Sequence, residues 1–179
     1  PGDPLPRIDE AARALLRGLE DAGVTTVDLW PALSASRYGE AGPAYCLTDS
    51  HWSGLGCALA ADALAARVSG LPWAKTVRRR VFSTEDRRVD IVGDLARGSS
   101  RGPESLVLRF VGRRGEAGLE PLPPDPASPV LLMGDSSCLV FHAGGDLHAA
   151  GAGLPDHLAR ALGFPVDLIG VRGSAATAA

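Results

Sequence analysis

Two groups of residues that could do chemistry lie far apart in this sequence. Residues 49–52 read Asp-Ser-His-Trp, and residues 134–137 read Gly-Asp-Ser-Ser directly after the apolar run 130–133. Such a run predicts a buried strand, and a turn at its end places a serine hydroxyl in the crevice where open α/β sheets bind ligands. If the fold joins the groups, Ser136 is a nucleophile, His51 its base and Asp49 the acid that orients the base. That set would perform covalent acyl transfer.

The spacing within the first group suits these roles. In an extended turn, side chains two positions apart emerge on the same side, so Asp49 can accept a hydrogen bond from the ring of His51. Ser53 is a good N-cap for a helix, which places His51 on a turn just before a helix rather than on a packed face. The backbone N–H of Ser136 or Ser137 is a candidate donor to a tetrahedral oxyanion.

Each residue also has an ordinary interpretation. A Gly-Asp-Ser turn or an Asp-x-His pair is common in proteins without catalysis, and Asp135 is better placed to shape the turn than to move protons. Ser137 is an alternative nucleophile, although the serine nearer the strand end is favoured. His142 and His148 lie on predicted loops that could line the pocket, whereas His157 is expected on a solvated helix face. Trp52 fits either a core position or a pocket rim.

The chain around these groups predicts an α/β protein, because helical and β-branched segments alternate along it. Residues 31–45 are expected to form a loop or a short helix. The segment 73–127 is rich in Gly, Pro and Arg and predicts a β-rich insertion with strands at 73–82, 89–92 and 106–111. Elsewhere we expect helices over 8–22, from Ser53 to about Gly70 and over 154–162, and strands over 24–29, 129–133 and 166–170.

Composition excludes several classes of function. The chain has 179 residues, 45% of them hydrophobic and 22% charged, which suits one globular domain over 1–179. A net charge of −3 with scattered arginines gives no nucleic-acid-binding signature. No apolar run approaches the roughly 18 residues that span a bilayer.

The three cysteines carry no metal-binding spacing. Cys46, Cys57 and Cys138 form no C-x-x-C pair and lie at no Cys/His ligand spacing, which argues against a zinc site. Cys46 and Cys138 flank the two chemical groups, so a disulfide between them is one option if those loops meet. We expect no metal and no cofactor.

The two groups and their surroundings resemble the SGNH-hydrolase-like domains of the alginate O-acetyltransferase group. The stretch 45–53 is similar to the Thr-Asp-x-His-Trp block of that group, in which the Asp-His block precedes the serine. The segments that resemble the group's preceding strand and turn, middle segment, and closing helix and strand are 27–33, 93–95, 156–158 and 166–169. The turn at 134–137 matches the Gly-x-Ser-x-Ser pattern in part, because Ser137 replaces an aromatic residue and Cys138 the next serine.

This resemblance covers most of the chain and implies a three-layer SGNH-like fold with a parallel central sheet. It implies Ser136 as nucleophile, His51 as base and Asp49 as orienting acid, and we add Trp52, Tyr45, Ser137 and His142 as substrate-binding candidates. The departures at Ser137 and Cys138 alter the pocket lining and leave the acceptor open. The group continues for another helix and strand beyond the region of Gly173, which suggests that this chain is truncated.

The resemblance further implies acetyl transfer to a polysaccharide outside the cytoplasm, with an acyl donor, a carbohydrate or small-molecule acceptor, and a partner protein as one route of acyl delivery. The sequence itself does not give the compartment. Two alternatives stay open at this point. One is an acetyl esterase that uses water as the acceptor, and the other is a non-catalytic carbohydrate-binding or assembly module.

Overall fold

The computed structural model describes residues 7–37, 39–98, 100 and 102–173. Within them the elements run α1 (Glu10–Asp21), α2 (Trp30–Ser36), α3 (Gly54–Ser69), η1 (Pro72–Lys75), β1 (Ser83–Ile91), η2 (Asp94–Ala96), β2 (Glu104–Gly115), β3 (Gly118–Pro121), β4 (Leu131–Gly134), α4 (Ser136–Leu139), η3 (Gly145–Leu147), α5 (Leu154–Leu162) and β5 (Asp167–Gly170), where η marks a short 3-10 helix. The alternation of helices and strands confirms the predicted α/β class.

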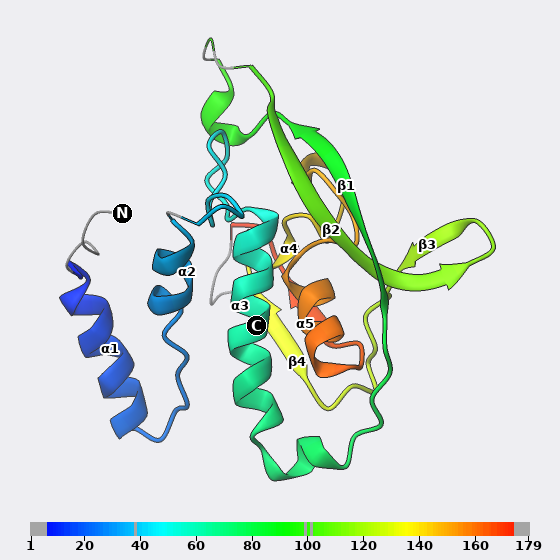
Figure 1. Cartoon of the computed structure of the whole chain (residues 1–179). Coiled ribbons are helices and arrows are strands. Elements are labelled where there is room, and N and C mark those ends of the chain that lie inside the picture. The colour runs from blue at the N-terminus through cyan, green and yellow to red at the C-terminus, as the bar shows by residue number, and fades with distance from the viewer. Residues whose placement is uncertain (1–6, 38, 99, 101, 174–179) are drawn as a thin grey trace.

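Helix α3 occupies the middle of the molecule, with α2 on one side and α5 on the other (Figure 1). Its N-terminus is capped as predicted, because the Ser53 hydroxyl accepts a hydrogen bond from the Gly56 N–H at 3.3 Å. Cys57, Ala60 and Ala61 are completely buried. These small side chains let α5 pack closely, and the two helices share a core with Phe164 and the strands behind them.

Strands β4 and β5 form a parallel pair in register from Leu131 opposite Asp167 to Gly134 opposite Gly170. Helix α5 lies between them in sequence, as a parallel connection requires. Among the described residues these are the strands of the parallel sheet, and the predicted runs 129–133 and 166–170 locate both. The pair carries the serine turn directly after Gly134, at the carboxyl end of β4.

The predicted insertion forms an antiparallel sheet in the order β1-β2-β3. Strands β1 and β2 pair along their full facing length, from Ser83 opposite Gly112 to Ile91 opposite Glu104. Leu108 packs with Cys57 of α3 and Val111 with Ala159 of α5, and a Cβ at Gly54 would lie 2.7 Å from the Leu108 side chain. The sheet therefore packs against the start of α3 and contributes to the core.

Three local predictions are wrong, and a fourth is right only in part. Residues 24–29 form no strand, since no described segment pairs with them to satisfy their backbone groups. Residues 73–82 form η1 and irregular chain rather than a strand, because Pro72 favours a helical start. The strand expected at 89–92 is present but already begins at Ser83. His157 is 1% exposed and lies under the antiparallel sheet near Arg109 and Asp86. The helical period placed it on a helix but could not show that a sheet covers that face.

Helix α1 confirms the helix expected over 8–22 but contributes nothing to the core. It contains no buried residue, and it stands beside α2 at the edge of the view in Figure 1. Arg7 connects this end to the following segment through ion pairs with Asp9 and Asp28. Within the described residues, no helix has the length and apolar character that crossing a membrane requires.

Candidate active site

The Asp-Ser-His-Trp group lies on a closed loop that leads into α3. Tyr45 and Trp52 face each other as an antiparallel bridge, and the Cys46 N–H donates to the His51 carbonyl at 3.2 Å. The N–H of Ser53 then donates to the carbonyl of Ala44 at 2.8 Å. These bonds close the loop at its base and confirm that His51 lies on a turn just before the helix.

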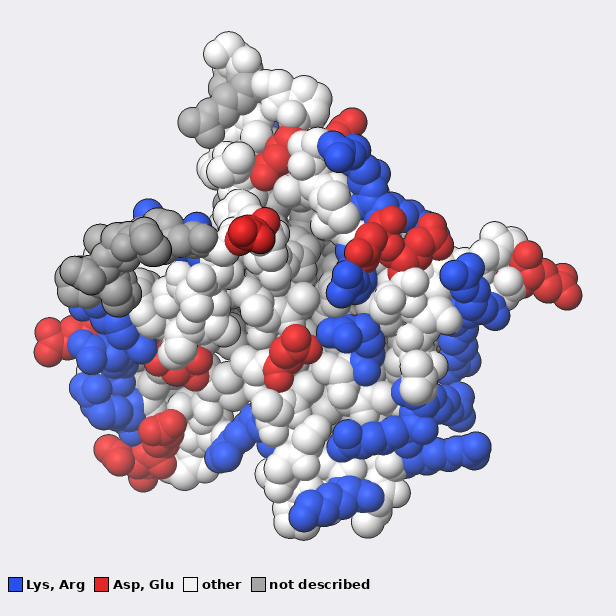
Figure 2. All heavy atoms as spheres, viewed as in Figure 1, with Lys and Arg blue, Asp and Glu red and all other residues white. Residues whose placement is uncertain are grey.

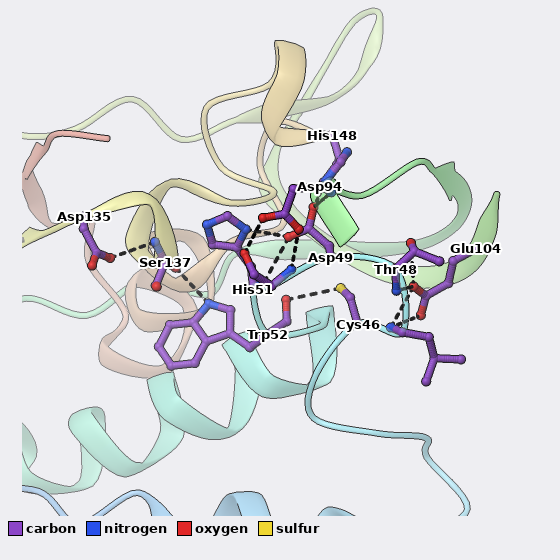
Figure 3. Close-up of polar contacts among 12 residues, drawn as sticks. Cys46, Thr48, Asp49, His51, Trp52, Asp94, Glu104, Asp135, Ser137 and His148 are labelled. Atoms are coloured by element: carbon purple, nitrogen blue, oxygen red, sulfur yellow. Dashed lines mark hydrogen bonds and ion pairs between the residues drawn. The ribbon is translucent and has the colours of Figure 1, made fainter. Parts of the chain in front are cut away.

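Asp49 accepts hydrogen bonds on both carboxylate oxygens (Figure 3). Its Oδ1 lies 2.5 Å from His51 Nδ1 and 3.0 Å from the His51 backbone N. Its Oδ2 lies 2.9 Å from His148 Nε2 and 3.3 Å from the Asp94 backbone N. The carboxylate is 5% exposed, so nearly all of its hydration has been replaced by these donors.

The hydrogen bonds determine the ionisation of Asp49. Burial would by itself raise the pKa, but the bonds from His148 and His51 outweigh it and lower the pKa of Asp49 to about 2. Asp49 is therefore a carboxylate at neutral pH and acts only as an acceptor. Because it accepts from Nδ1 of His51, this nitrogen carries the hydrogen and Nε2 is left with a lone pair. That is the tautomer a general base needs.

Two further acids hold the loop in place, and sequence reasoning assigned a role to neither. Asp94 accepts from the backbone N–H of Ser50 at 2.7 Å and from its hydroxyl at 2.6 Å. Glu104, at the start of β2, accepts from the Leu47 and Thr48 N–H groups and from the Thr48 hydroxyl at 3.0 Å. The polar residues of the loop are thus paired with the antiparallel sheet and with η2.

Close approach of the backbone also fixes the loop. A Cβ at Gly93 would lie 2.1 Å from the Thr48 carbonyl oxygen and 2.5 Å from the Cβ of Asp49, so only glycine fits there. The only sign of this contact in the sequence was the resemblance of residues 93–95 to a middle segment of the family. Sequence reasoning also missed Glu104 and the contact of His148 with Asp49. Both residues come from distant segments that contain no local motif.

The serine turn has the predicted position at the end of a parallel strand. Ser136 is half-buried and is the first residue of α4, two positions after β4 ends. Asp135 caps this short helix, because its Oδ1 accepts from the Ser137 N–H at 2.8 Å. Asp135 therefore shapes the turn, as expected. The Ser137 N–H is occupied by this bond, which leaves the Ser136 N–H as the remaining oxyanion donor of the two candidates.

The loop and the turn meet through Trp52. Its indole Nε1–H donates to the Ser137 carbonyl at 2.8 Å, across 85 positions of sequence. The bond joins the residue after His51 to the residue after Ser136. In Figure 3 the Trp52 ring lies below Ser137, and the His51 ring lies on the same side of Asp49 as this turn. Trp52 is thus half-buried at the contact between the two groups.

The remaining candidates are Tyr45 and His142. Tyr45 is 53% exposed at the base of the loop. His142 contacts Asp156 Oδ2 through Nδ1 at 2.9 Å and lines a small cavity, open to solvent, whose other walls are mainly proline and aliphatic side chains. This cavity is formed by α5 and the segments before β4 and β5, and it includes Leu122 and Val166.

The option of a Cys46–Cys138 disulfide is wrong, because all three cysteines are free thiols. Cys46 instead faces the Trp52 carbonyl, at 3.5 Å. Burial raises the pKa of Cys46 to about 12 and that of Cys138 to about 11. Both thiols are therefore protonated at neutral pH and are poor nucleophiles. Within the part of the chain that the structure describes, no group of His, Cys, Asp and Glu side chains is arranged to hold a metal ion.

Comparison with known proteins agrees with this architecture. A family model described as an SGNH hydrolase-like domain, acetyltransferase AlgX, matches residues 2–178. The structure is similar to the O-acetyltransferase domain of Pseudomonas putida AlgJ, with a TM-score of 0.70 and 22% identity over 98% of this chain and 59% of that one. It is also similar to Pseudomonas aeruginosa AlgX, with a TM-score of 0.67 and 17% identity over 92% of this chain and 36% of that one. This chain therefore spans less than two thirds of either. No curated protein matches the sequence.

Proposed function

The chain belongs to the family of SGNH hydrolase-like acetyltransferase domains described by the AlgX family model, and from this premise we propose that Ser136, His51 and Asp49 act together to move an acetyl group. The reaction passes through an acyl-serine on Ser136, and the acceptor is a hydroxyl of a polysaccharide or another sugar. The catalytic roles rest on the geometry of this chain. The acetyl group and the sugar rest on the family and on the printed names of its structural neighbours.

One observation carries the proposal. The His51 ring is held at 2.5 Å by an ionised, buried Asp49, on a loop that Trp52 ties to the residue after Ser136. A histidine with a buried acid on Nδ1 and a free Nε2 beside a serine turn is the arrangement that activates a hydroxyl. The half-buried serine at the carboxyl end of a parallel strand supplies that hydroxyl.

The steps follow from the tautomer of His51. Nε2 accepts the proton of the Ser136 hydroxyl as Oγ attacks the carbonyl carbon of an acetyl ester, and the Ser136 N–H donates to the oxyanion. The imidazolium, stabilised by Asp49, then returns the proton to the leaving alkoxide, and an acetyl-serine remains. In the second half a sugar hydroxyl gives its proton to Nε2 and attacks the acetyl carbon. The proton passes back to Oγ, and the serine is free again.

Trp52, Tyr45, Ser137 and His142 are proposed to line the substrate site. Trp52 and Ser137 have the strongest support, because their hydrogen bond lies beside the catalytic group. Membership of the family is also the basis for placing the domain outside the cytoplasm, with an acyl donor and with a partner protein as one source of the acetyl group.

The two adjacent serines allow a matched test of the nucleophile. Hydrolysis of p-nitrophenyl acetate should fall by at least about 10³-fold in Ser136→Ala and by less than about tenfold in Ser137→Ala, since a nucleophile cannot be replaced and a neighbouring hydroxyl can. Loss of activity only in Ser137→Ala would move the nucleophile by one residue. Wild-type activity in both variants would contradict a serine mechanism.

The acceptor is tested separately from the nucleophile. With an acetyl ester and alginate oligosaccharides, the proposal predicts O-acetylated sugar that depends on Ser136, measured by mass spectrometry. If free acetate is the only product with every sugar tried, the domain acts as an esterase. If Ser136 forms no acyl intermediate at all, the domain is a binding or assembly module.

A further inference from the structure

His148 occupies the side of Asp49 that His51 leaves open. Its Nε2 lies 2.9 Å from Asp49 Oδ2, whereas the His51 ring contacts Oδ1. The imidazole side chain is 11% exposed, and Figure 3 shows it above Asp49 on the side away from the Ser137 turn. Asp49 is therefore held between two imidazole rings. A catalytic triad needs only one imidazole beside its acid, so the presence of the second imidazole needs an explanation.

The loop that carries His148 begins at the serine turn. It follows α4, passes through η3 (Gly145–Leu147) and returns to α5. The Phe141 N–H donates to the Leu147 carbonyl at 2.9 Å, and the His148 N–H donates to the Gly145 carbonyl at 3.1 Å. The nucleophile and His148 are thus on one continuous, internally bonded segment, and the contact of His148 with Asp49 is a second link between that segment and the Asp-His loop.

The backbone of this loop is held in an unfavourable conformation. Among the described residues, Phe141 with φ of 58° and His148 with φ of 74° are the two non-glycine residues with positive φ. Their rings lie against each other, with centroids 5.8 Å apart and planes at 39°. An L-residue takes this conformation only where the surrounding structure imposes it, and such residues gather at functional sites.

We propose that His148 is a positioning residue, which donates its Nε2–H to Asp49 and so keeps the other carboxylate oxygen aimed at His51. This inference rests on the proposed function of Ser136, His51 and Asp49. The direction of the bond follows from the ionised state of Asp49, because a carboxylate can only accept. Without His148, Oδ2 keeps only the longer bond from the Asp94 N–H at 3.3 Å, so the carboxylate is held less firmly in its contact with His51.

The effect of His148 should appear in kcat rather than in KM. The imidazolium of His51 exists only after the serine has given up its proton, so a well-aimed Asp49 stabilises the transition state more than bound substrate. His148 itself touches no reacting atom. A residue of this kind acts through another residue, and a substitute that restores the same donor should restore the rate.

The test compares two replacements at position 148. His148→Phe keeps a ring against Phe141 and removes the donor, whereas His148→Gln keeps an N–H donor near the position of Nε2 and removes the ring. We expect kcat for p-nitrophenyl acetate to fall about tenfold or more in His148→Phe with KM within about twofold, and His148→Gln to recover to within about threefold of wild type. Equal rates in His148→Phe and wild type, or equal losses in both variants, would overturn the proposal.

A spectroscopic measurement tests the contact between His148 and Asp49 independently of enzyme activity. Long-range ¹H–¹⁵N spectra of the wild-type protein should show the neutral His148 ring protonated on Nε2, and the His51 Nδ1–H signal should shift in His148→Phe. A wild-type His148 that carries its proton on Nδ1 would overturn the inference even if Ser136 is the nucleophile. If the wild-type protein forms no acyl-serine, the proposed function is refuted. The spectrum would still test the contact between His148 and Asp49.

Discussion

Among the described residues, Asp49 and Asp156 each contact the Nδ1 of a histidine, but only the loop of Asp49 is joined to the serine turn through Trp52. Asp49 accepts from His51 Nδ1 at 2.5 Å, and Asp156 contacts His142 Nδ1 at 2.9 Å. Both acids also accept from a backbone N–H, His51 in one case and Gly153 in the other. They are 5% and 1% exposed. By type, spacing of atoms and burial, the two pairs are nearly the same.

Their surroundings differ in ways that decide what each can do. Asp156 lies in the first turn of α5, where its bond to the Gly153 N–H caps the helix, and its Oδ1 has no hydrogen-bond partner among the described residues. Asp49 has both oxygens occupied and lies on a loop joined to the serine turn through Trp52. A histidine–acid pair is therefore a weak sign of catalysis by itself. Its connection to a nucleophile is the stronger one.

Substituting the two acids in the same way should separate these roles, and it carries the largest expected effect. Asp49→Asn should lower kcat by roughly 10³- to 10⁴-fold, because an amide favours the wrong tautomer of His51. Asp156→Asn should lower the free energy of unfolding by about 1–2 kcal/mol through a weaker helix cap, while its kcat stays at least about 100-fold above that of Asp49→Asn. Ester hydrolysis and denaturant unfolding measure both. Similar kcat values in the two variants would remove the distinction.

His157, a fully buried imidazole on α5, extends the comparison with a smaller effect, on stability alone. Burial, with help from Arg160 and Arg109, lowers the pKa of His157 from 6.5 to about 4. Between these two pH values the unfolded chain binds a proton at His157 and the folded protein does not. The free energy of unfolding therefore decreases as the pH falls from about 6.5 to about 4. The loss should be about 3 kcal/mol for wild type.

His157→Gln should remove that part of the pH dependence, since an amide does not titrate. Denaturant unfolding at several pH values between 7 and 4, for both proteins, gives the difference curve. Parallel curves would contradict the prediction, because they would show that folding does not lower the pKa of His157. Activity at neutral pH should change little, because His157 lies under the antiparallel sheet and has no assigned part in the reaction.

The local features of the site could be predicted from sequence, and its long-range contacts could not. Asp49, His51 and Ser136 stood out because each lies in a short motif next to a predictable element, and α3, α5 and β4 formed where expected. The meeting of the two motifs was implied by the resemblance to a family, since spacing in the chain gives no distance in space. The Trp52–Ser137 bond supplies that contact.

The errors have a common physical cause. The β-branched run 24–29 looks like a strand, but a strand needs a neighbour, and none of the described segments pairs with it. His157 looked solvated because the sheet that covers it comes from another part of the chain. His148 lay in a predicted loop with no pattern of its own, and only its contact with Asp49 singles it out.

The central claim is that the Asp49–His51 pair activates Ser136. The most direct measurement mixes the protein with an acetyl ester, quenches the reaction in acid and locates the acetyl group by peptide mass spectrometry. The account predicts an acetyl group on the peptide that contains Ser136, assigned to that residue, in wild type and none in His51→Ala. Acetyl on another residue, or on Ser136 at the same rate in His51→Ala, would contradict it.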